Sequence, residues 1–262
     1  MILNDLRLPS ALLAVAVLSA CVRPPDTNAL PNRFGEGAAD VEAVPAAVEQ
    51  SSVTAEQRAM YNAVEDDGIP IPAVPARFLN SETVRQEVNY WSSEAPGTII
   101  VDPHARYLYQ IKPDNRAMRY TVAVGAAGYG WTGEAHVPYK RDWPHWTPTQ
   151  NMIKREPDLY GPIRDGLDGG IENPLGARAL YLHDESGDTL YRIHGTPEPE
   201  SIGHGTSSGC IRLFNQDIIH LASKTDSMTK VMVLTEAQSG RGTVPPLAEA
   251  ADVRKQSKGE AT

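Results

Sequence analysis

Two side chains capable of covalent chemistry, His194 and Cys210, lie sixteen positions apart in the glycine-rich run IHGTPEPESIGHGTSSGCIRL. A thiol with an ordinary pKa of roughly 8.5 is a weak nucleophile until a base or a positive environment removes its proton. Because the run between the two residues is rich in glycine, it can fold back and bring the imidazole to the sulfur. The backbone N–H groups of Gly209 and Cys210 could then converge on one point and form an oxyanion hole. The pattern predicts acyl transfer, with Cys210 as the nucleophile and His194 as the general base and acid.

An arginine and further histidines accompany these two residues. Arg212 follows the cysteine by two positions, and a fixed guanidinium suits a carboxylate on a substrate. A zinc site made of His183, His194, His204 and Cys210 is disfavoured, because their spacing matches no tight ligand pattern. We therefore expect neither a metal nor another cofactor.

The second of the two cysteines, Cys21, directly follows the apolar run ALLAVAVLSA. That run is shorter than the roughly 20 residues of a bilayer-spanning helix, and it is typical of an export signal. The stretch LSAC resembles the lipobox of bacterial lipoproteins, which implies a signal peptide at 1–20 and a lipid on Cys21. Val22 in place of aspartate favours the outer membrane, so we expect a lipid-anchored protein in the periplasm. The alternatives are an ordinary signal peptide with an incidental cysteine, and a disulfide between Cys21 and Cys210.

Residues 21–96 are predicted to form an acidic tether rich in proline and alanine, with short helices. Thr54 and Gln57 make a capping-box pattern that begins one helix, and residues 80–91 suggest a second. The acidic run at 65–67 is interpreted as solvated linker. The net charge of the whole chain is −9, which argues against a nucleic-acid partner because phosphate contacts need a basic face.

Residues 97–236 have the pattern of a mainly-β domain. The runs TIIVD, RYLYQI and RYTVAVG, the pair RALYLHD and TLYRIHG, and the closing VMVLTE are strand candidates separated by turn signals. Within LYRIH, Leu190, Arg192 and His194 would share one face of a strand. A helix over NQDIIHLASKT would have Asn215 as its N-cap. Many short strands with few helices predict a β-sandwich or barrel.

Two further segments lack strand patterns. Residues 126–177 are aromatic and interrupted by proline and glycine, and a loop of this length predicts small elements or a lid over a site. Trp143 and Tyr160 in this insert are candidates for lining a substrate, with plain packing as the alternative. The polar tail at 237–262 is expected to be flexible.

The run around the cysteine resembles the signature of the L,D-transpeptidases, the YkuD-type enzymes that modify peptidoglycan. That signature is a histidine, a glycine-rich spacer, and S/T-H-G-C followed by a small apolar residue and Arg or Asn. Here it reads His194-Gly195-Thr196 and then Ser207-Ser208-Gly209-Cys210-Ile211-Arg212-Leu213. The segments TIIVD…RYLYQI…RYTVAVG, NPLGARALYL and VMVLTE extend the resemblance to about residues 97–236. Ser208 stands where the family pattern has a histidine, which leaves His194 as the main candidate base.

The resemblance implies a YkuD-like β-sandwich of mixed strands, with short helices and a long lid-like insert. It also implies that Cys210 attacks the carbonyl between meso-diaminopimelate and terminal D-Ala in a tetrapeptide stem of peptidoglycan. An amine of another stem, or of an outer-membrane protein, would resolve the thioester. A backbone carbonyl near Gly195 would orient His194. The residues expected to bind substrate are Ser207, Ser208 and Arg212.

Two alternatives to transfer remain from the sequence. In the first, water replaces the amine, which gives an L,D-carboxypeptidase or an endopeptidase acting on the same type of bond. In the second, the chain is a catalytically silent lipoprotein that binds the cell wall. The intact pair of His194 and Cys210 speaks against the second alternative.

Overall fold

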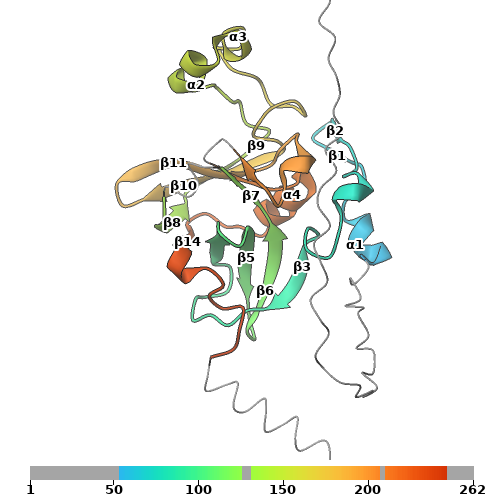
Figure 1. The fold of residues 1–262 in the computed structure, drawn as a ribbon, viewed down its shortest axis with the longest axis vertical. Helices are drawn as coiled ribbons and strands as arrows, with labels where there is room; N and C mark the ends of the chain where they lie inside the picture. The colour runs from blue at the N-terminus through green and yellow to red at the C-terminus, as the bar shows by residue number, and fades with distance from the viewer. Residues whose placement is uncertain (1–52, 126–130, 207–209, 247–262) are drawn as a thin grey trace, which may run out of the picture. The chain divides into compact units, whose positions relative to one another are not determined.

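The structure is a computed structural model that describes residues 53–125, 131–206 and 210–246. These residues form fourteen strands and four short α-helices (Figure 1), so the prediction of a mainly-β fold is confirmed. The helices are α1 (Ala55–Ala59), α2 (Gln150–Arg155), α3 (Pro157–Tyr160) and α4 (Asn215–Ser223). Among the described residues, no helix has the length and apolarity needed to cross a membrane.

Two strands make a small hairpin, β1 (Val64–Asp66) with β2 (Ile69–Ile71), and twelve make the main sheet. The order in the main sheet is β12-β7-β13-β11-β10-β8-β14-β4-β5-β6-β3, with β9 paired to β10. The bounds are β3 (Gln86–Asn89), β4 (Ile99–Asp102), β5 (Tyr107–Lys112), β6 (Arg116–Thr121), β7 (Ala123–Gly125), β8 (Gly133–Val137), β9 (Lys140–Asp142), β10 (Arg178–Asp184), β11 (Gly187–His194), β12 (Gly205–Thr206), β13 (Ile211–Arg212) and β14 (Thr229–Val233).

The main sheet folds over on itself. Only Val122 separates β6 from β7 in the chain, although eight strand-to-strand steps separate them in the sheet. In a flat sheet those steps would span about 38 Å, which a single residue cannot bridge. The curvature brings Leu108, Val124 and Ile193 into one buried cluster, which Ile218 of α4 also joins. The sheet therefore encloses its own core, as the expected β-sandwich requires.

Residues 53–91 belong to this folded unit. Strand β3 pairs with β6 at the edge of the main sheet, and Tyr61 and Val74 pack in a second buried cluster with Phe214. The predicted tether at 21–96 therefore contains, from Val53 onward, residues that complete the fold. Its earlier part, together with the signal peptide and Cys21, lies outside the described residues.

One of the two helices predicted in this segment is present and the other is not. Helix α1 begins after Thr54, whose hydroxyl and the Gln57 side chain form the reciprocal capping box. The helix predicted over 80–91 is wrong: Asn80 accepts hydrogen bonds from the backbone of Glu82 and Thr83, which makes a turn. The strand β3 then follows, because tertiary pairing with β6 overrides the weak local helix signal.

The acidic run at 65–67 is not solvated linker throughout. The carboxylate of Asp66 accepts hydrogen bonds from both terminal nitrogens of Arg178, at 2.6 and 2.8 Å. It also accepts one from the indole nitrogen of Trp143, at 2.8 Å. These contacts attach the β1–β2 hairpin to the start of β10 and to the first residue after β9. The described part of the tail is also attached, since the carbonyl of Gly242 accepts a hydrogen bond from Trp91.

We expect Asp66→Ala to lower the free energy of unfolding by about 1–3 kcal/mol, the usual cost of deleting hydrogen bonds to a charged group. Arg178 retains Asp142 as a partner at 2.8 Å, which limits the loss. Urea unfolding measures the effect. The matched control is Glu65→Ala, an exposed neighbour, which should change stability by less than about 0.5 kcal/mol. Equal losses in the two variants would contradict the anchoring role of Asp66.

Candidate active site

Parallel pairing of β11 with β13 brings the histidine and the cysteine together. Ile193 pairs with Ile211 and His194 with Arg212, and Cys210 immediately precedes β13. Paired residues face the same side and side chains alternate along a strand, so His194, Arg212 and Cys210 belong to one face. The offset of two residues between His194 and Cys210 corresponds to about 6.6 Å along the strands, in addition to the roughly 4.8 Å between neighbouring strands.

His194 is a buried, oriented imidazole. It is 4% exposed, and its Nδ1 lies 2.6 Å from the carbonyl oxygen of Gly195. A carbonyl only accepts, so Nδ1 carries the proton and Nε2 keeps the lone pair that a base needs. Burial lowers the pKa of His194 to about 4; the positive charges of Arg212 and Arg192 add to this, and the Gly195 carbonyl opposes it. The imidazole is therefore neutral at neutral pH.

Cys210 is a half-buried free thiol. Burial raises the pKa of Cys210, while a backbone hydrogen bond from Arg192 and the charges of Arg192 and Arg212 oppose the rise. With the pKa of the imidazole lowered and that of the thiol raised, the resting pair is neutral thiol and neutral imidazole. The proton must therefore pass to His194 when an electrophile arrives, because no thiolate is formed in advance.

Two guanidinium groups flank this pair, and each has a carboxylate partner. Arg212 lies 2.8 Å from Glu198. Arg192 lies 2.7 Å from Asp188 and stacks over the ring of Tyr181 at 4.2 Å. A substrate carboxylate at Arg212 would have to share or displace Glu198, which lies in the spacer between the histidine and the cysteine.

Tyr191 interacts electrostatically with the site, which the sequence did not indicate. Its ring lies 5.5 Å from that of Trp131, and its pKa is raised first by burial and then by Cys210. The β10–β11 register shifts between Tyr181 and His183, and Leu190 has a positive φ of 63°.

This bulge contradicts the expected face of Leu190. We expected Leu190 to share a face with Arg192 and His194, but it is 77% exposed. The left-handed conformation breaks the alternation of the strand at this point. No residue type in the sequence signals the bulge, since leucine rarely adopts a positive φ.

The insert contains small elements rather than an unstructured loop. Its described part includes β8, β9, α2 and α3. Trp143 is held by Asp66, and Tyr160 lies beside Trp146 with ring centroids 6.2 Å apart. None of these described contacts reaches Cys210 or His194, so a substrate-lining role for Trp143 and Tyr160 stays a prediction. Ser207, Ser208 and Gly209 lie outside the described residues.

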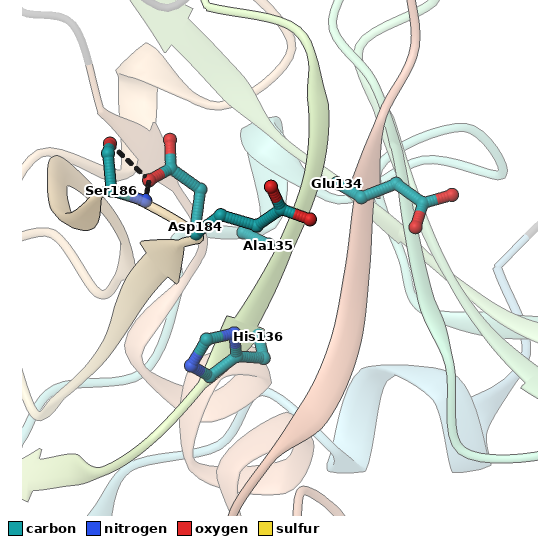
Figure 2. A pocket seen from close by; sticks show the side chains of 6 residues that line it. Glu134, Ala135, His136, Asp184 and Ser186 are labelled. Carbon is teal, nitrogen blue, oxygen red and sulfur yellow. Dashed lines mark hydrogen bonds between the residues drawn. The ribbon is translucent and has the colours of Figure 1, made fainter.

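A hollow of about 490 Å³ lies elsewhere, between β8 and the turn joining β10 to β11 (Figure 2). Glu134, Asp184 and Glu185 line it. The carboxylate of Asp184 accepts hydrogen bonds from the backbone N–H and the hydroxyl of Ser186. Glu134 forms an ion pair with Lys230 at 3.1 Å. Within the described residues, no three metal-ligating side chains are grouped. The hollow shares no lining residue with the His194–Cys210 site.

Comparison with known proteins adds to this geometry. The family model of the YkuD L,D-transpeptidase catalytic domain matches residues 96–233. The chain is 33% identical over 167 residues to the probable L,D-transpeptidase YbiS of Escherichia coli K12, covering 62% of this chain and 49% of that protein. It is 29% identical over 168 residues to the probable L,D-transpeptidase ErfK/SrfK of the same strain, covering 62% and 48%.

Solved structures also match. A probable carnitine operon oxidoreductase from Brucella melitensis is 44% identical, with a TM-score of 0.41, covering 57% of this chain and 92% of that one. The chain spans about half the length of the curated relatives it matches.

Proposed function

Because the chain belongs to the YkuD family of L,D-transpeptidase catalytic domains, we propose that it is a peptidoglycan L,D-transpeptidase with Cys210 as its nucleophile. The observation that carries the proposal is the β11–β13 pairing of His194 with Arg212, two residues after Cys210, which supports a location of both side chains on one face. The Gly195 carbonyl supports it by leaving Nε2 of His194 free to accept a proton. The proposed donor is a tetrapeptide stem, cleaved between diaminopimelate and terminal D-Ala.

The proposed reaction proceeds in two transfers. As Cys210 Sγ bonds to the substrate carbonyl, its proton moves to His194 Nε2, and the backbone N–H groups of Gly209 and Cys210 stabilise the oxyanion. The buried imidazolium has a pKa near 4 and is therefore more acidic than an ordinary imidazolium. It readily returns the proton to the departing amine of D-Ala. An acceptor amine then attacks the thioester, the C–S bond breaks, and the proton lost by the amine passes through His194 to the departing Cys210 sulfur. Arg212 holds a stem carboxylate, and Ser207 and Ser208 shape the pocket.

The rate of Cys210 acylation should fall on the acidic side only near pH 4. The base must be neutral, and an ordinary histidine would be only about one-tenth neutral at pH 5.5. Since burial lowers the pKa of His194 to about 4, we expect the rate of Cys210 acylation by a carbapenem to stay nearly constant from pH 7 to pH 5.5. Intact-mass kinetics across this range measure it. An acylation rate that falls to half its pH 7 plateau near pH 6.5 would show that His194 titrates as an exposed residue.

The identity of the acceptor distinguishes the proposed transpeptidase from a hydrolase and from a catalytically silent protein. The protein is incubated with purified tetrapeptide muropeptides, and the products are analysed by mass spectrometry. Cross-linked dimers support transfer to another stem, and tripeptides alone support an L,D-carboxypeptidase. Unchanged muropeptides contradict both and favour a silent wall-binding lipoprotein. Adding a candidate outer-membrane protein tests the other proposed acceptor.

The proposed location is the periplasm, with a lipid on Cys21 and the outer membrane as the anchor. The support is the LSAC stretch after the apolar run and Val22 after the cysteine. We expect labelled palmitate to enter the wild-type protein and not Cys21→Ala, which should lose its membrane association. Label entering both proteins equally would contradict lipidation at Cys21.

A further inference from the structure

Asn215 does not do what its sequence position predicts. We expected it to cap the helix at NQDIIHLASKT, but the N-cap of α4 is Phe214 and no side chain caps the helix. Asn215 is only 5% exposed, and its amide points to two loops. Its Oδ1 accepts a hydrogen bond from the backbone N–H of Ala177 at 2.9 Å. Its Nδ2 donates to the carbonyl of Thr196 at 3.1 Å.

Two glycines allow the loops to come this close to the amide. A Cβ on Gly195 would lie 2.2 Å from Asn215 Oδ1, and one on Gly176 would lie 2.3 Å from the same atom. Gly176 also has a positive φ of 60°. Side chains at either position would push the loops away from Asn215, so the glycines and the asparagine form one packed unit.

One of these loops presents a carbonyl group to the imidazole of His194. The Gly195 carbonyl lies 2.6 Å from Nδ1 of His194. Asn215 binds the next residue, Thr196, and ties it to Ala177 in the other loop. The amide of Asn215 meets both requirements, because its oxygen accepts and its nitrogen donates, whereas a carboxylate cannot donate and an alkyl group can do neither.

We propose that Asn215 is a positioning residue, which ties Ala177 to Thr196 and so holds the Gly195 carbonyl that fixes the ring of His194. In this role Asn215 touches neither substrate nor Cys210 and acts through His194. The inference rests on the proposed function of His194 as the base. Its structural part, the fixed imidazole tautomer, can be tested without any catalytic assay.

The experiment compares Asn215→Ala with Gln216→Ala in the full chain. Gln216 is the next residue and is also buried, but its amide bonds to the carbonyl groups of Pro72 and Asn62 in the N-terminal segment. ¹⁵N-NMR of the histidine ring reports the tautomer, and intact-mass kinetics report carbapenem acylation of Cys210. We expect wild type and Gln216→Ala to show the Nδ1–H form and equal acylation rates, with a lower melting temperature for Gln216→Ala.

In Asn215→Ala we expect a mixture of tautomers and acylation slower by about 10- to 100-fold, by analogy with the loss of hydrogen-bond partners that orient metal-binding histidines. If Asn215→Ala does not fold, Asn215→Asp preserves the volume and the acceptor for Ala177 while removing the donor to Thr196, and it should give the same changes. A variant that folds, keeps the Nδ1–H form and reacts at the wild-type rate overturns the proposal. Failure of the wild type itself to react would refute the proposed function, whereas the tautomer result would still decide the role of Asn215.

Discussion

Cys210→Ala is expected to abolish carbapenem adduct formation and every change in tetrapeptide muropeptides. The wild-type protein should gain the mass of one carbapenem molecule, and peptide mapping should place it on Cys210. The reason is that the proposed chemistry requires a covalent bond to sulfur, and Cys210 is the only cysteine among the described residues. The variant should remain folded, because the side chain is half-buried and alanine preserves its Cβ.

His194→Gln is the companion variant for this test. It retains the thiol but removes the proton acceptor, so acylation should slow by about 10²–10⁴-fold, the usual contribution of a general base. An adduct in Cys210→Ala at the wild-type rate would place the nucleophile elsewhere. An unchanged rate in His194→Gln would show that another group takes the thiol proton.

The second large effect is expected on stability, from Arg85→Ala. The carboxylate of Asp217 is fully buried in α4, where it pairs with Arg85 at 2.8 Å and accepts from the hydroxyl of Tyr61 at 3.1 Å. Removing the guanidinium leaves a buried charge with one hydrogen bond. Losing one partner of such a pair costs about 3–5 kcal/mol. Urea unfolding at pH 7.5 measures the loss.

The pH dependence identifies the cause of that loss. Burial already raises the pKa of Asp217 to about 6, against the opposing effect of Arg85. Without Arg85 the folded-state pKa rises further above the unfolded value, so the variant gains stability as pH falls and its carboxyl binds a proton. The difference in the free energy of unfolding between wild type and Arg85→Ala should therefore become smaller between pH 7.5 and pH 5. The control Arg58→Ala removes an exposed cation of the same segment and should cost less than about 0.5 kcal/mol. A difference in the free energy of unfolding that stays constant with pH would show that the loss comes from packing instead of the buried charge.

The candidate site could be located from the sequence because its parts are local. His194, Gly195 and Cys210 fall within one short run, and their types specify the chemistry before any fold is known. The strands could also be predicted where β-rich runs alternate with turn signals. The parallel pairing of β11 with β13 adds what the spacing could not supply, which is the face that the side chains share.

The N-terminal segment could not be predicted in the same way. Arg85 and Asp217 lie 132 residues apart, and Asp66 and Arg178 lie 112 apart. No periodicity or capping pattern in the sequence reflects such contacts, so an acidic stretch rich in proline and alanine predicts a tether. Asn215 shows the same limit, since its position at a helix start is typical of a cap, whereas its partners are set by the tertiary structure.

Inclusion of residues 53–91 in the folded unit would also limit how far from a membrane the proposed lipid-anchored protein could act. With the proposed lipid on Cys21, the chain between anchor and fold is residues 22–52 instead of 22–96. Fully extended, 31 residues span at most about 110 Å, compared with about 270 Å for 75 residues. The proposed enzyme can therefore reach only stem peptides or protein acceptors within that shorter radius of its anchoring leaflet.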